Sequence, residues 1–252
     1  KLPKLVVEED IEGDGHVHSK FSDGTASLEE IIAKAEAMGL LWVAVCDHSQ
    51  GLKVAGGVPI EELYKKKKRI EELNKRSSKV KLIFGAEVDI LSDGSLDYPD
   101  EVLKDIDFVI AAIHTGFQQE ERQITHRIVS ALKHPLVHAL SHPTGRVIGE
   151  REPYQVNMEE VLKVAKEYGK ALEINAYYKR LDLNDIYVKA CVELGIPLII
   201  GTDAHFLDQM EYLKLGVAVA RRGWCEKKDL LNCLDYDTFI KWLSKVRENR
   251  HV

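Results

Sequence analysis

Short apolar runs alternate with longer polar stretches along most of the chain. Each run contains few polar residues and is followed within two positions by histidine, aspartate, glutamate or asparagine. Near-continuous apolar strands separated by helical stretches are typical of a parallel sheet covered by helices. We therefore predict strands over six runs, namely Leu40–Cys46, Lys81–Ala86, Phe108–Ile113, Leu136–Ser141, Ala171–Ile174 and Ile196–Gly201.

The stretches between these runs carry helix signals. Ser27 is a candidate N-cap with Glu30 three residues later, and Gly39 follows as a terminating residue, which predicts a helix over Ser27–Met38. The basic run Lys65–Arg69 falls in a second helical stretch, and we interpret it as a solvated face. The other predicted helices are Glu61–Lys75, Thr125–Lys133, Asn157–Tyr168 and Asn184–Leu194.

Counted with the opening stretch, about seven strand–helix units favour an α/β barrel over an open sheet. No internal sequence repeat or low-complexity tract divides the chain. We predict one domain over residues 1–252, with residues 1–12 as an entry segment and 13–252 as the barrel. Residues 207–252 are expected to complete the outer layer of that barrel.

The polar residues after the strands define a candidate site. In a parallel α/β barrel all strands point their carboxyl ends at one mouth, where active sites are built. Within GDGHVHSKFSDGTAS (residues 13–27), His16 and His18 are two positions apart and share one strand face. Asp203 and His205 have the same spacing. The residues expected to converge with them at this mouth are His48, Glu87, His114, His142 and Asn175.

Six histidines and three carboxylates at one rim exceed what a single ion needs. One catalytic zinc uses three protein ligands and a water, so nine ligands suit three ions if one carboxylate bridges. Imidazole and carboxylate without thiolate fit Zn, Mn or Fe. A lone buried histidine is more often hydrogen-bonded within a core. We expect this for His138, with support of a ligand from below the rim as the alternative. The nine candidate metal ligands are His16, His18, Asp23, His48, Glu87, His114, His142, Asp203 and His205.

Composition narrows the class of protein. The chain has 252 residues and a formal net charge of -6, which argues against a strongly basic nucleic-acid binder. It does not exclude a nuclease, because bound cations supply local positive charge. No apolar run approaches the ~18 residues that span a bilayer, so no membrane partner is expected. The four cysteines form no CxxC pair, which favours free thiols and a cytoplasmic location.

The order of the motifs resembles a known family. DGHVHSKFSDG, Asp47-His48, GAEVDI, IHT, SHPTGR and TDAH follow the motifs of the PHP (polymerase and histidinol phosphatase) superfamily. The stretches HPTGRVIGEREPY, EINAYYKRLDLND and GVAVARRGWCEKKDLLN resemble its branch at the C-terminus of bacterial and archaeal family X DNA polymerases. The resemblance covers residues 2–242 and implies a distorted TIM-like (βα)7 barrel with a metal cluster at the carboxyl ends of the strands.

The resemblance also sorts the nine ligands among three divalent metal ions. It implies that Glu87 bridges two of the ions and is catalytic together with Asp203 and Arg146. The implied sets are His16, His18, Glu87 and Asp203 for the first ion; Glu87, His114 and His142 for the second; and Asp23, His48 and His205 for the third.

For function, the resemblance implies a metal-dependent phosphoesterase that hydrolyses phosphodiesters at DNA 3′ ends during DNA repair. This is a 3′–5′ exonuclease, with 3′-phosphatase or abasic-site endonuclease activity as further options. A polymerase region is then expected before Lys1. Two alternatives stay open: a small-molecule phosphomonoesterase of the histidinol-phosphate or nucleotide type, and a non-catalytic, metal-stabilised accessory domain.

Substrate-binding candidates follow the strand ends. Arg146 is expected to clamp phosphate oxygens, with a surface salt bridge as the alternative. Tyr177 and Tyr178 could stack a base or pack at the rim. The remaining candidates for contacts to substrate are Lys53, Asn175, Lys179 and Arg180.

Overall fold

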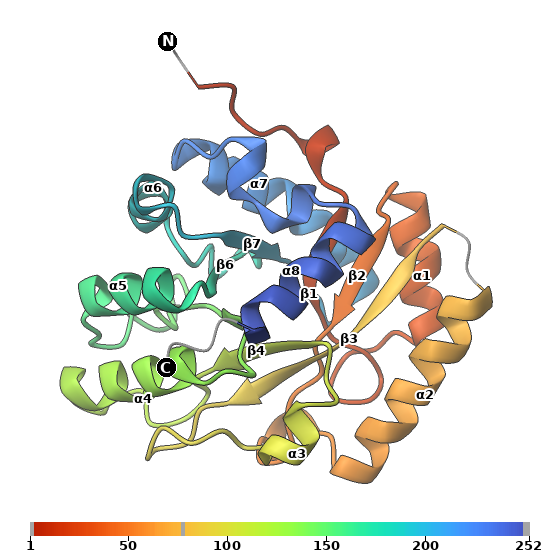
Figure 1. The fold of residues 1–252 in the computed structure, drawn as a ribbon, viewed down its shortest axis with the longest axis horizontal. Coiled ribbons are helices and arrows are strands. Elements are labelled where there is room, and N and C mark those ends of the chain that lie inside the picture. The colour runs from red at the N-terminus through yellow and green to blue at the C-terminus, as the bar shows by residue number, and fades with distance from the viewer. Residues whose placement is uncertain (1–2, 77–78, 249–252) are drawn as a thin grey trace.

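Seven parallel strands form the centre of the molecule, in a computed structural model that describes residues 3–76 and 79–248. Each strand pairs with the next along the chain, so the sheet order is the sequence order. This confirms the predicted α/β architecture (Figure 1). The strands are β1 (Gly13–Val17), β2 (Trp42–Val45), β3 (Lys81–Asp89), β4 (Phe108–Ala112), β5 (Ala139–Leu140), β6 (Ala171–Asn175) and β7 (Leu198–Gly201).

The first and last strands meet and nearly close the barrel. At the carboxyl end, Val17 and Ala204 form a parallel bridge, and the Asp203 amide donates to the His16 carbonyl at 2.8 Å. At the other end, buried Asn232 of η5 (Leu231–Cys233) fills the seam. Its side-chain amide donates to the carbonyls of Gly13 (2.9 Å) and Ile200 (2.8 Å).

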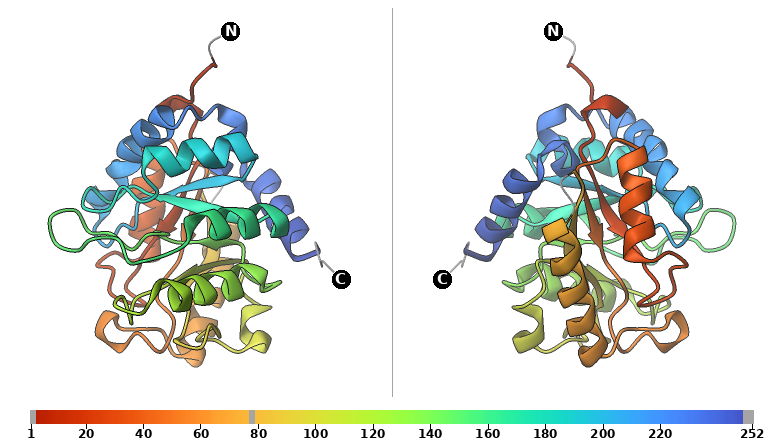
Figure 2. Two further views of the ribbon diagram at one scale, coloured as in Figure 1. Left: turned by 90° about the vertical axis from the view of Figure 1, so that its left-hand side faces the viewer. Right: turned by 90° about the vertical axis from the view of Figure 1, so that its right-hand side faces the viewer.

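Helices between the strands form the outer layer, as both side views show (Figure 2). The predicted capping box is present, since the Ser27 hydroxyl accepts from the Glu30 amide at 3.2 Å and the Glu30 carboxylate accepts from the Ser27 amide at 2.7 Å. Within the described residues, no helix is both long and apolar enough to cross a bilayer. The helices are α1 (Leu28–Ala37), α2 (Ile60–Arg76), α3 (Asp100–Leu103), α4 (Glu121–Lys133), α5 (Met158–Tyr168), α6 (Asp185–Leu194), α7 (Leu213–Arg222) and α8 (Tyr236–Glu248), with the short 3-10 helices η1 (Glu8–Asp10), η2 (Lys53–Ala55), η3 (Leu207–Tyr212) and η4 (Lys227–Asp229).

The last helix corrects one expectation. Residues 207–252 were expected to complete the outer layer, but within them α8 crosses the amino-terminal opening of the barrel (Figure 1). Phe239 stacks on Trp42 of β2, with ring centroids 4.4 Å apart, and meets Phe108 of β4 edge-on at 5.8 Å. The apolar face of α8 therefore plugs the end of the barrel opposite the predicted site.

The basic run in α2 corrects a second expectation. Lys66 is fully buried instead of solvated, because it lies on the same helix face as Leu63 and Ile70. Its ammonium group is 2.7 Å from the Asp47 carboxylate and donates to the carbonyls of Val45 and Gly85. One lysine of this basic run therefore forms a buried ion pair, and its partner Asp47 directly precedes the predicted ligand His48.

Candidate metal centre

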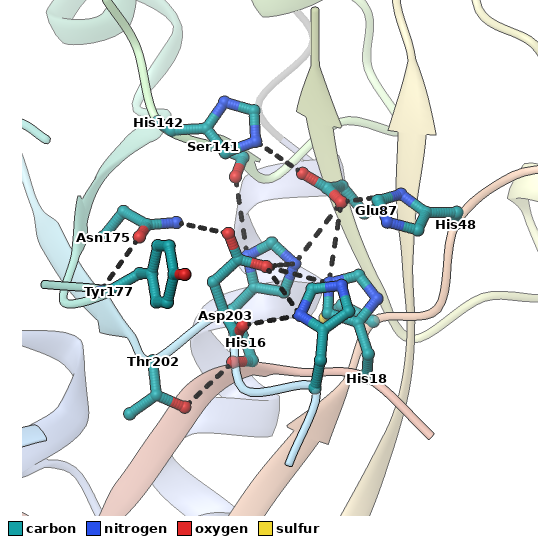
Figure 3. A network of polar contacts seen from close by, with 12 residues as sticks. His16, His18, His48, Glu87, Ser141, His142, Asn175, Tyr177, Thr202 and Asp203 are labelled. Atoms are coloured by element: carbon teal, nitrogen blue, oxygen red, sulfur yellow. Dashed lines mark hydrogen bonds and ion pairs between the residues drawn. The ribbon is translucent and has the colours of Figure 1, made fainter. Parts of the chain in front are cut away.

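All nine predicted ligands gather at the carboxyl ends of the strands. Figure 3 shows six of them, namely His16, His18, His48, Glu87, His142 and Asp203. They come from β1, β3 and the loops after β1, β2, β4, β5 and β7. Ligands as far apart in the sequence as His16 and His205 therefore meet in one cluster. Most of these side chains are buried, while those of Asp23 and His205 are 32% and 28% exposed. The cluster therefore opens to solvent on the side of these two residues.

Glu87 occupies the centre of the cluster. Its strand, β3, is the longest of the seven and carries the carboxylate past the end of β2. The carboxylate touches imidazoles from four different segments, which is the arrangement a bridging ligand requires. The histidine nitrogens lie at 2.9 Å (His142 Nε2), 3.0 Å (His48 Nδ1), 3.3 Å (His114 Nε2), 3.6 Å (His16 Nε2) and 3.7 Å (His18 Nε2) from its oxygens.

The two aspartates face the other side of the same histidines. Asp203 Oδ1 is 3.1 Å from His18 Nε2 and 4.0 Å from His16 Nε2. Asp23 Oδ1 is 3.7 Å from both His18 Nδ1 and His48 Nε2, and its Oδ2 is 3.3 Å from His205 Nε2.

Candidate donor atoms fall into three groups. Within each group all atoms lie within 4.8 Å of one another, a spacing compatible with one shared ion. Compared with the expected sorting, His18 and His48 each belong to two groups. His142 belongs to none of the three, and it contacts the cluster through Glu87 and, edge-on, through the ring of His114. The groups are His16, His18 and Asp203; His48, Glu87 and His114; and His18, Asp23, His48 and His205.

Orphaned polar atoms show that this donor set suits cations. His16 Nε2, His18 Nδ1, His48 Nδ1 and Glu87 Oε2 are buried and make no well-aligned hydrogen bond among the described residues, although His48 Nδ1 lies only 3.0 Å from Glu87 Oε2. Leaving such an atom unpaired costs about 1–3 kcal/mol. Divalent ions between these atoms would satisfy them, and the mixture of imidazole and carboxylate fits Zn, Mn or Fe.

A carboxylate beneath the ligands was not among the predicted site residues. Buried Glu173 of β6 accepts from His16 Nδ1 at 2.8 Å, from the Ser141 hydroxyl at 2.8 Å and from the His142 amide at 2.7 Å. The bond to His16 fixes the tautomer that turns Nε2 towards the cluster. Gly201 leaves room for it, since a Cβ there would lie 2.3 Å from the Glu173 carboxylate.

A second supporting carboxylate, Asp89, binds His114 in the same way, through Nδ1. Strand alternation was the available signal for both, because Glu173 precedes Asn175 by two positions and Asp89 follows Glu87 by two. Backing carboxylates of this kind orient imidazole ligands and make them more basic.

The electrostatics are those of a cation site. Burial alone would lower the pKa of His114, but Glu87 and Asp89 outweigh it and raise it to about 10. Burial is likewise outweighed at His205, where Asp23 and Asp203 raise the pKa to about 9. At Glu87 burial works in the opposite direction, yet the neighbouring histidines hold its pKa well below the usual range. Protons therefore occupy imidazoles where metal ions would bind.

Two predicted ligands have strained backbones. His142 and Asp203 have positive φ angles of 25° and 54°, a region that costs non-glycine residues of the order of 1–3 kcal/mol. Side chains beneath them hold these conformations. Glu173 accepts from the His142 amide, and buried Asn175 donates to the Asp203 carboxylate at 3.1 Å and to Glu173 at 3.2 Å. Asn175 thus supports a ligand from below.

The arginine and lysine side chains predicted to bind substrate lie in different environments. Arg146 donates to the main-chain carbonyls of Arg180 (2.7 Å) and Leu181, so its guanidinium supports a loop. Arg180 itself reaches the cluster, with Nε 3.5 Å from Asp203 Oδ2 and one terminal nitrogen buried without a partner among the described residues. Lys179 pairs with Glu150 at the surface, and Lys53 is exposed on η2.

His138 lies in the core, as expected. Its Nδ1 accepts from the Val109 amide at 3.0 Å, and its Nε2 lies 3.2 Å from Nε of Arg247 in α8. Both ring nitrogens thus face polar groups of the core, and burial together with Arg247 and Lys170 holds its pKa well below the usual value. It is therefore a neutral core histidine outside the cluster.

Comparisons with known proteins agree with this geometry. Residues 14–179 match the PHP domain family. The Bacillus subtilis protein "DNA polymerase/3'-5' exonuclease PolX" is 40% identical over 234 residues, which cover 92% of this chain and 41% of that protein. A "Probable phosphatase" of Thermoanaerobacter is 31% identical, over 76% of this chain and 78% of its own length.

Among solved structures, the histidinol phosphate phosphatase of Lactococcus lactis, complexed with zinc, L-histidinol and phosphate, has the same fold. It superimposes with a TM-score of 0.60 at 19% identity, over 83% of this chain and 93% of its own. The fold and the cluster define a PHP-type phosphoesterase barrel. The chain belongs to the PHP domain family and is a metal-dependent phosphoesterase.

Proposed function

We propose that this chain hydrolyses phosphodiesters at DNA 3′ ends as a 3′–5′ exonuclease. The observation that carries the proposal is its 40% identity to the Bacillus subtilis PolX protein over 92% of the chain. The chain spans only 41% of the length of that relative. A polymerase region acting together with this chain on DNA is therefore part of the proposal.

We propose three divalent ions, of Zn, Mn or Fe, at the cluster. Glu87 is the proposed bridge between the first ion (His16, His18, Asp203) and the second (His114, His142), while Asp23, His48 and His205 hold the third. The three donor groups support this number, and the central position of Glu87 supports the bridge. Bound ions of this kind supply an activated water and neutralise phosphoryl oxygens.

The chain's own groups prepare the site for a phosphate. Glu173 and Asp89 orient His16 and His114 with their second nitrogens facing the cluster. Arg180 presents an unpartnered guanidinium nitrogen beside Asp203 and is the proposed ligand of a phosphoryl oxygen. Arg146 acts on the substrate indirectly, by holding the loop that carries Arg180.

A second candidate is a small-molecule phosphomonoesterase. The relatives named as probable phosphatases support it, since this chain covers 78% of one at 31% identity. The two candidates differ in the ester that they cleave, and the metal chemistry is common to both.

A substrate panel on one preparation separates them. With added manganese, we expect faster release of nucleotides from recessed and single-stranded DNA 3′ ends than hydrolysis of histidinol phosphate or mononucleotides. The reaction on DNA should slow as salt rises, because phosphate contacts release counterions. Efficient cleavage of the small esters with intact DNA ends would replace the exonuclease by the phosphatase.

The bridge has its own test. Glu87→Ala should remove two ions together and abolish hydrolysis, as measured by elemental analysis and activity on the same sample. Glu159→Ala, on the exposed face of α5, is the matched control. Full metal content and full activity in the Glu87 variant would contradict the bridging role.

A further inference from the structure

Three tyrosines meet beside the metal centre and form what we call the tyrosine ledge: Tyr177, Tyr178 and Tyr212. The first two follow β6, and the third ends η3, which follows β7. Ring centroids are 4.9 Å apart for Tyr177 and Tyr178, 5.7 Å for Tyr178 and Tyr212, and 6.2 Å for Tyr177 and Tyr212. Loops from two neighbouring strands thus build one aromatic surface.

The ledge is open to solvent. Tyr178 is 49% exposed, and its neighbours Tyr177 and Tyr212 are half-buried. Tyr178 contacts its two aromatic neighbours edge-on or tilted, which leaves ring surface uncovered. An exposed aromatic surface beside a reaction centre is suited to stacking on a flat ligand.

One residue ties the ledge to the metal centre. Asn175 accepts from the Tyr177 amide at 3.1 Å, while its side-chain amide donates to Asp203 at 3.1 Å. Figure 3 shows the Tyr177 ring next to Asn175 on the Asp203 side of the cluster. A molecule bound at the ions would therefore have an aromatic surface next to it.

The same turn supplies a phosphate ligand. The Arg180 amide donates to the Tyr177 carbonyl at 2.7 Å, closing a tight turn over residues 177–180. The guanidinium of Arg180 then reaches Asp203, with one buried nitrogen unpartnered among the described residues. An anion-binding group and an exposed ring are thus held a few residues apart, which matches a phosphate and a flat heterocycle in one ligand.

We propose that the tyrosine ledge stacks the nucleobase of the nucleotide whose phosphate sits at the metal centre. This inference rests on the proposed phosphoesterase site and names the part of the substrate that it recognises. The base can belong to a strand end or to a free nucleotide. Stacking tolerates every base, because each has a π-face, so the ledge confers affinity for nucleotides with little sequence preference.

Fluorescence of 2-aminopurine tests the stacking directly, because that base is quenched when it stacks. The first probe is a single-stranded oligonucleotide with 3′-terminal 2-aminopurine and a phosphorothioate last linkage, which slows hydrolysis. The second probe is the free nucleotide 2-aminopurine riboside 5′-monophosphate. Tyr178→Ala should bind about five- to hundred-fold more weakly than the unchanged protein, measured with whichever of the two probes the unchanged protein binds more tightly.

Conservative and control variants separate stacking from loop support. Tyr178→Phe keeps the ring and should restore quenching and affinity, whereas Tyr178→Leu keeps apolar bulk and should not. Tyr64→Ala, an exposed tyrosine on α2, should behave as the unchanged protein does. Metal content and melting temperature are measured for all variants, since neither should change with the loss of a stacking contact.

Hydrolysis supplies an independent readout. The unchanged protein should release a terminal normal nucleotide faster than a terminal abasic one, and Tyr178→Ala should abolish that difference. If Tyr178→Ala quenches 2-aminopurine as strongly as the unchanged protein and keeps the same ratio of normal to abasic release rates, the tyrosine ledge does not stack the base. The proposed DNA hydrolysis would be unaffected by that result. Failure of all DNA hydrolysis with tight, Tyr178-dependent binding of the free nucleotide would instead overturn the exonuclease and retain the ledge.

Discussion

Protons and metal ions compete for the same imidazole nitrogens at the barrel mouth. Without metal, the pKa values of His114 and His205 are raised to about 10 and about 9, so both are protonated at pH 7. An imidazole must lose its proton to bind a metal. Metal affinity should therefore rise with pH through neutrality and level off only near these two pKa values.

Calorimetry checks this competition. Manganese titrated at pH 7 into the protein, in buffers of different ionisation enthalpy, should release about three protons per chain. One comes from each of these two histidines and one from His16, where Glu173 and Glu87 outweigh burial and raise the pKa well above the usual value. His126→Gln, a change at an exposed position of α4, should leave that number unchanged. A binding heat that does not depend on the buffer would show that these imidazoles are neutral before metal binds.

Alanine variants of Arg180 and Arg146 should differ in their kinetics and in their stability. Arg180→Ala should lower kcat/KM about ten- to hundred-fold with metal content intact, because a charge-assisted contact is worth roughly 1.5–3 kcal/mol. Arg146→Ala should lower the melting temperature as well as the rate, since its guanidinium holds two loop carbonyls. A larger rate loss for Arg146→Ala, at unchanged stability, would reverse the two roles.

Residues at strand ends could be predicted because their spacing and their place after apolar runs are visible in sequence. The supporting residues Glu173 and Asp89 could have been found by the same alternation. Arg146 could not be placed, since its direction depends on the path of residues 180–181, which no local pattern encodes. Side-chain direction in a loop is a tertiary property.

At the scale of elements, α2 supports the metal centre through one buried ion pair. Lys66 holds Asp47, which accepts from the Ser19 amide and hydroxyl and from the Ser22 hydroxyl. These serines lie in the loop that carries Asp23. Lys66→Met should cost about 3–5 kcal/mol of unfolding free energy, because it leaves a buried charge unpaired, and should weaken metal binding at Asp23.

Urea unfolding and metal titration test this ion pair. Lys65→Met, one residue earlier but exposed, should change stability by no more than about 0.5 kcal/mol. Asp47→Asn combined with Lys66→Met should recover part of the lost stability, since no charge then remains buried. If Lys66→Met is as stable as the Lys65 control, the pair contributes nothing to the fold.

Helix and strand positions followed from periodicity and caps, with differences at their ends. The predicted helix over Thr125–Lys133 begins at Glu121, because Glu120 and Gln123 form a polar capping box ahead of the first apolar residue. Lys66 was misassigned because the whole basic run was placed on one solvated helix face, whereas the helical period puts Lys66 on the buried face with Leu63 and Ile70.

At the scale of the molecule, the two ends of the barrel have different roles, one in stability and the other in metal binding. The amino-terminal end is plugged by α8 and sealed by Asn232, whereas the carboxyl end carries the ligand cluster. The alternation of strands and helices predicted the barrel, and a barrel implies a common mouth. The plug could not be predicted, because an amphipathic helix has the same pattern of apolar and polar residues whether it covers the outside of a barrel or its end.

For the proposed DNA substrate, the net charge of the whole chain should make bound metal a condition for binding. At a formal charge of -6 the protein repels a polyanion, and three divalent ions would add about six positive charges at the mouth. Fluorescence anisotropy of a labelled single strand at low salt should therefore show at least about ten-fold weaker binding after chelation. Added manganese should restore affinity to the unchanged protein but not to Glu87→Ala, which lacks the bridge. Equal affinity with and without chelator would mean that the cationic side chains alone hold DNA, and the ions would then serve only the hydrolytic step.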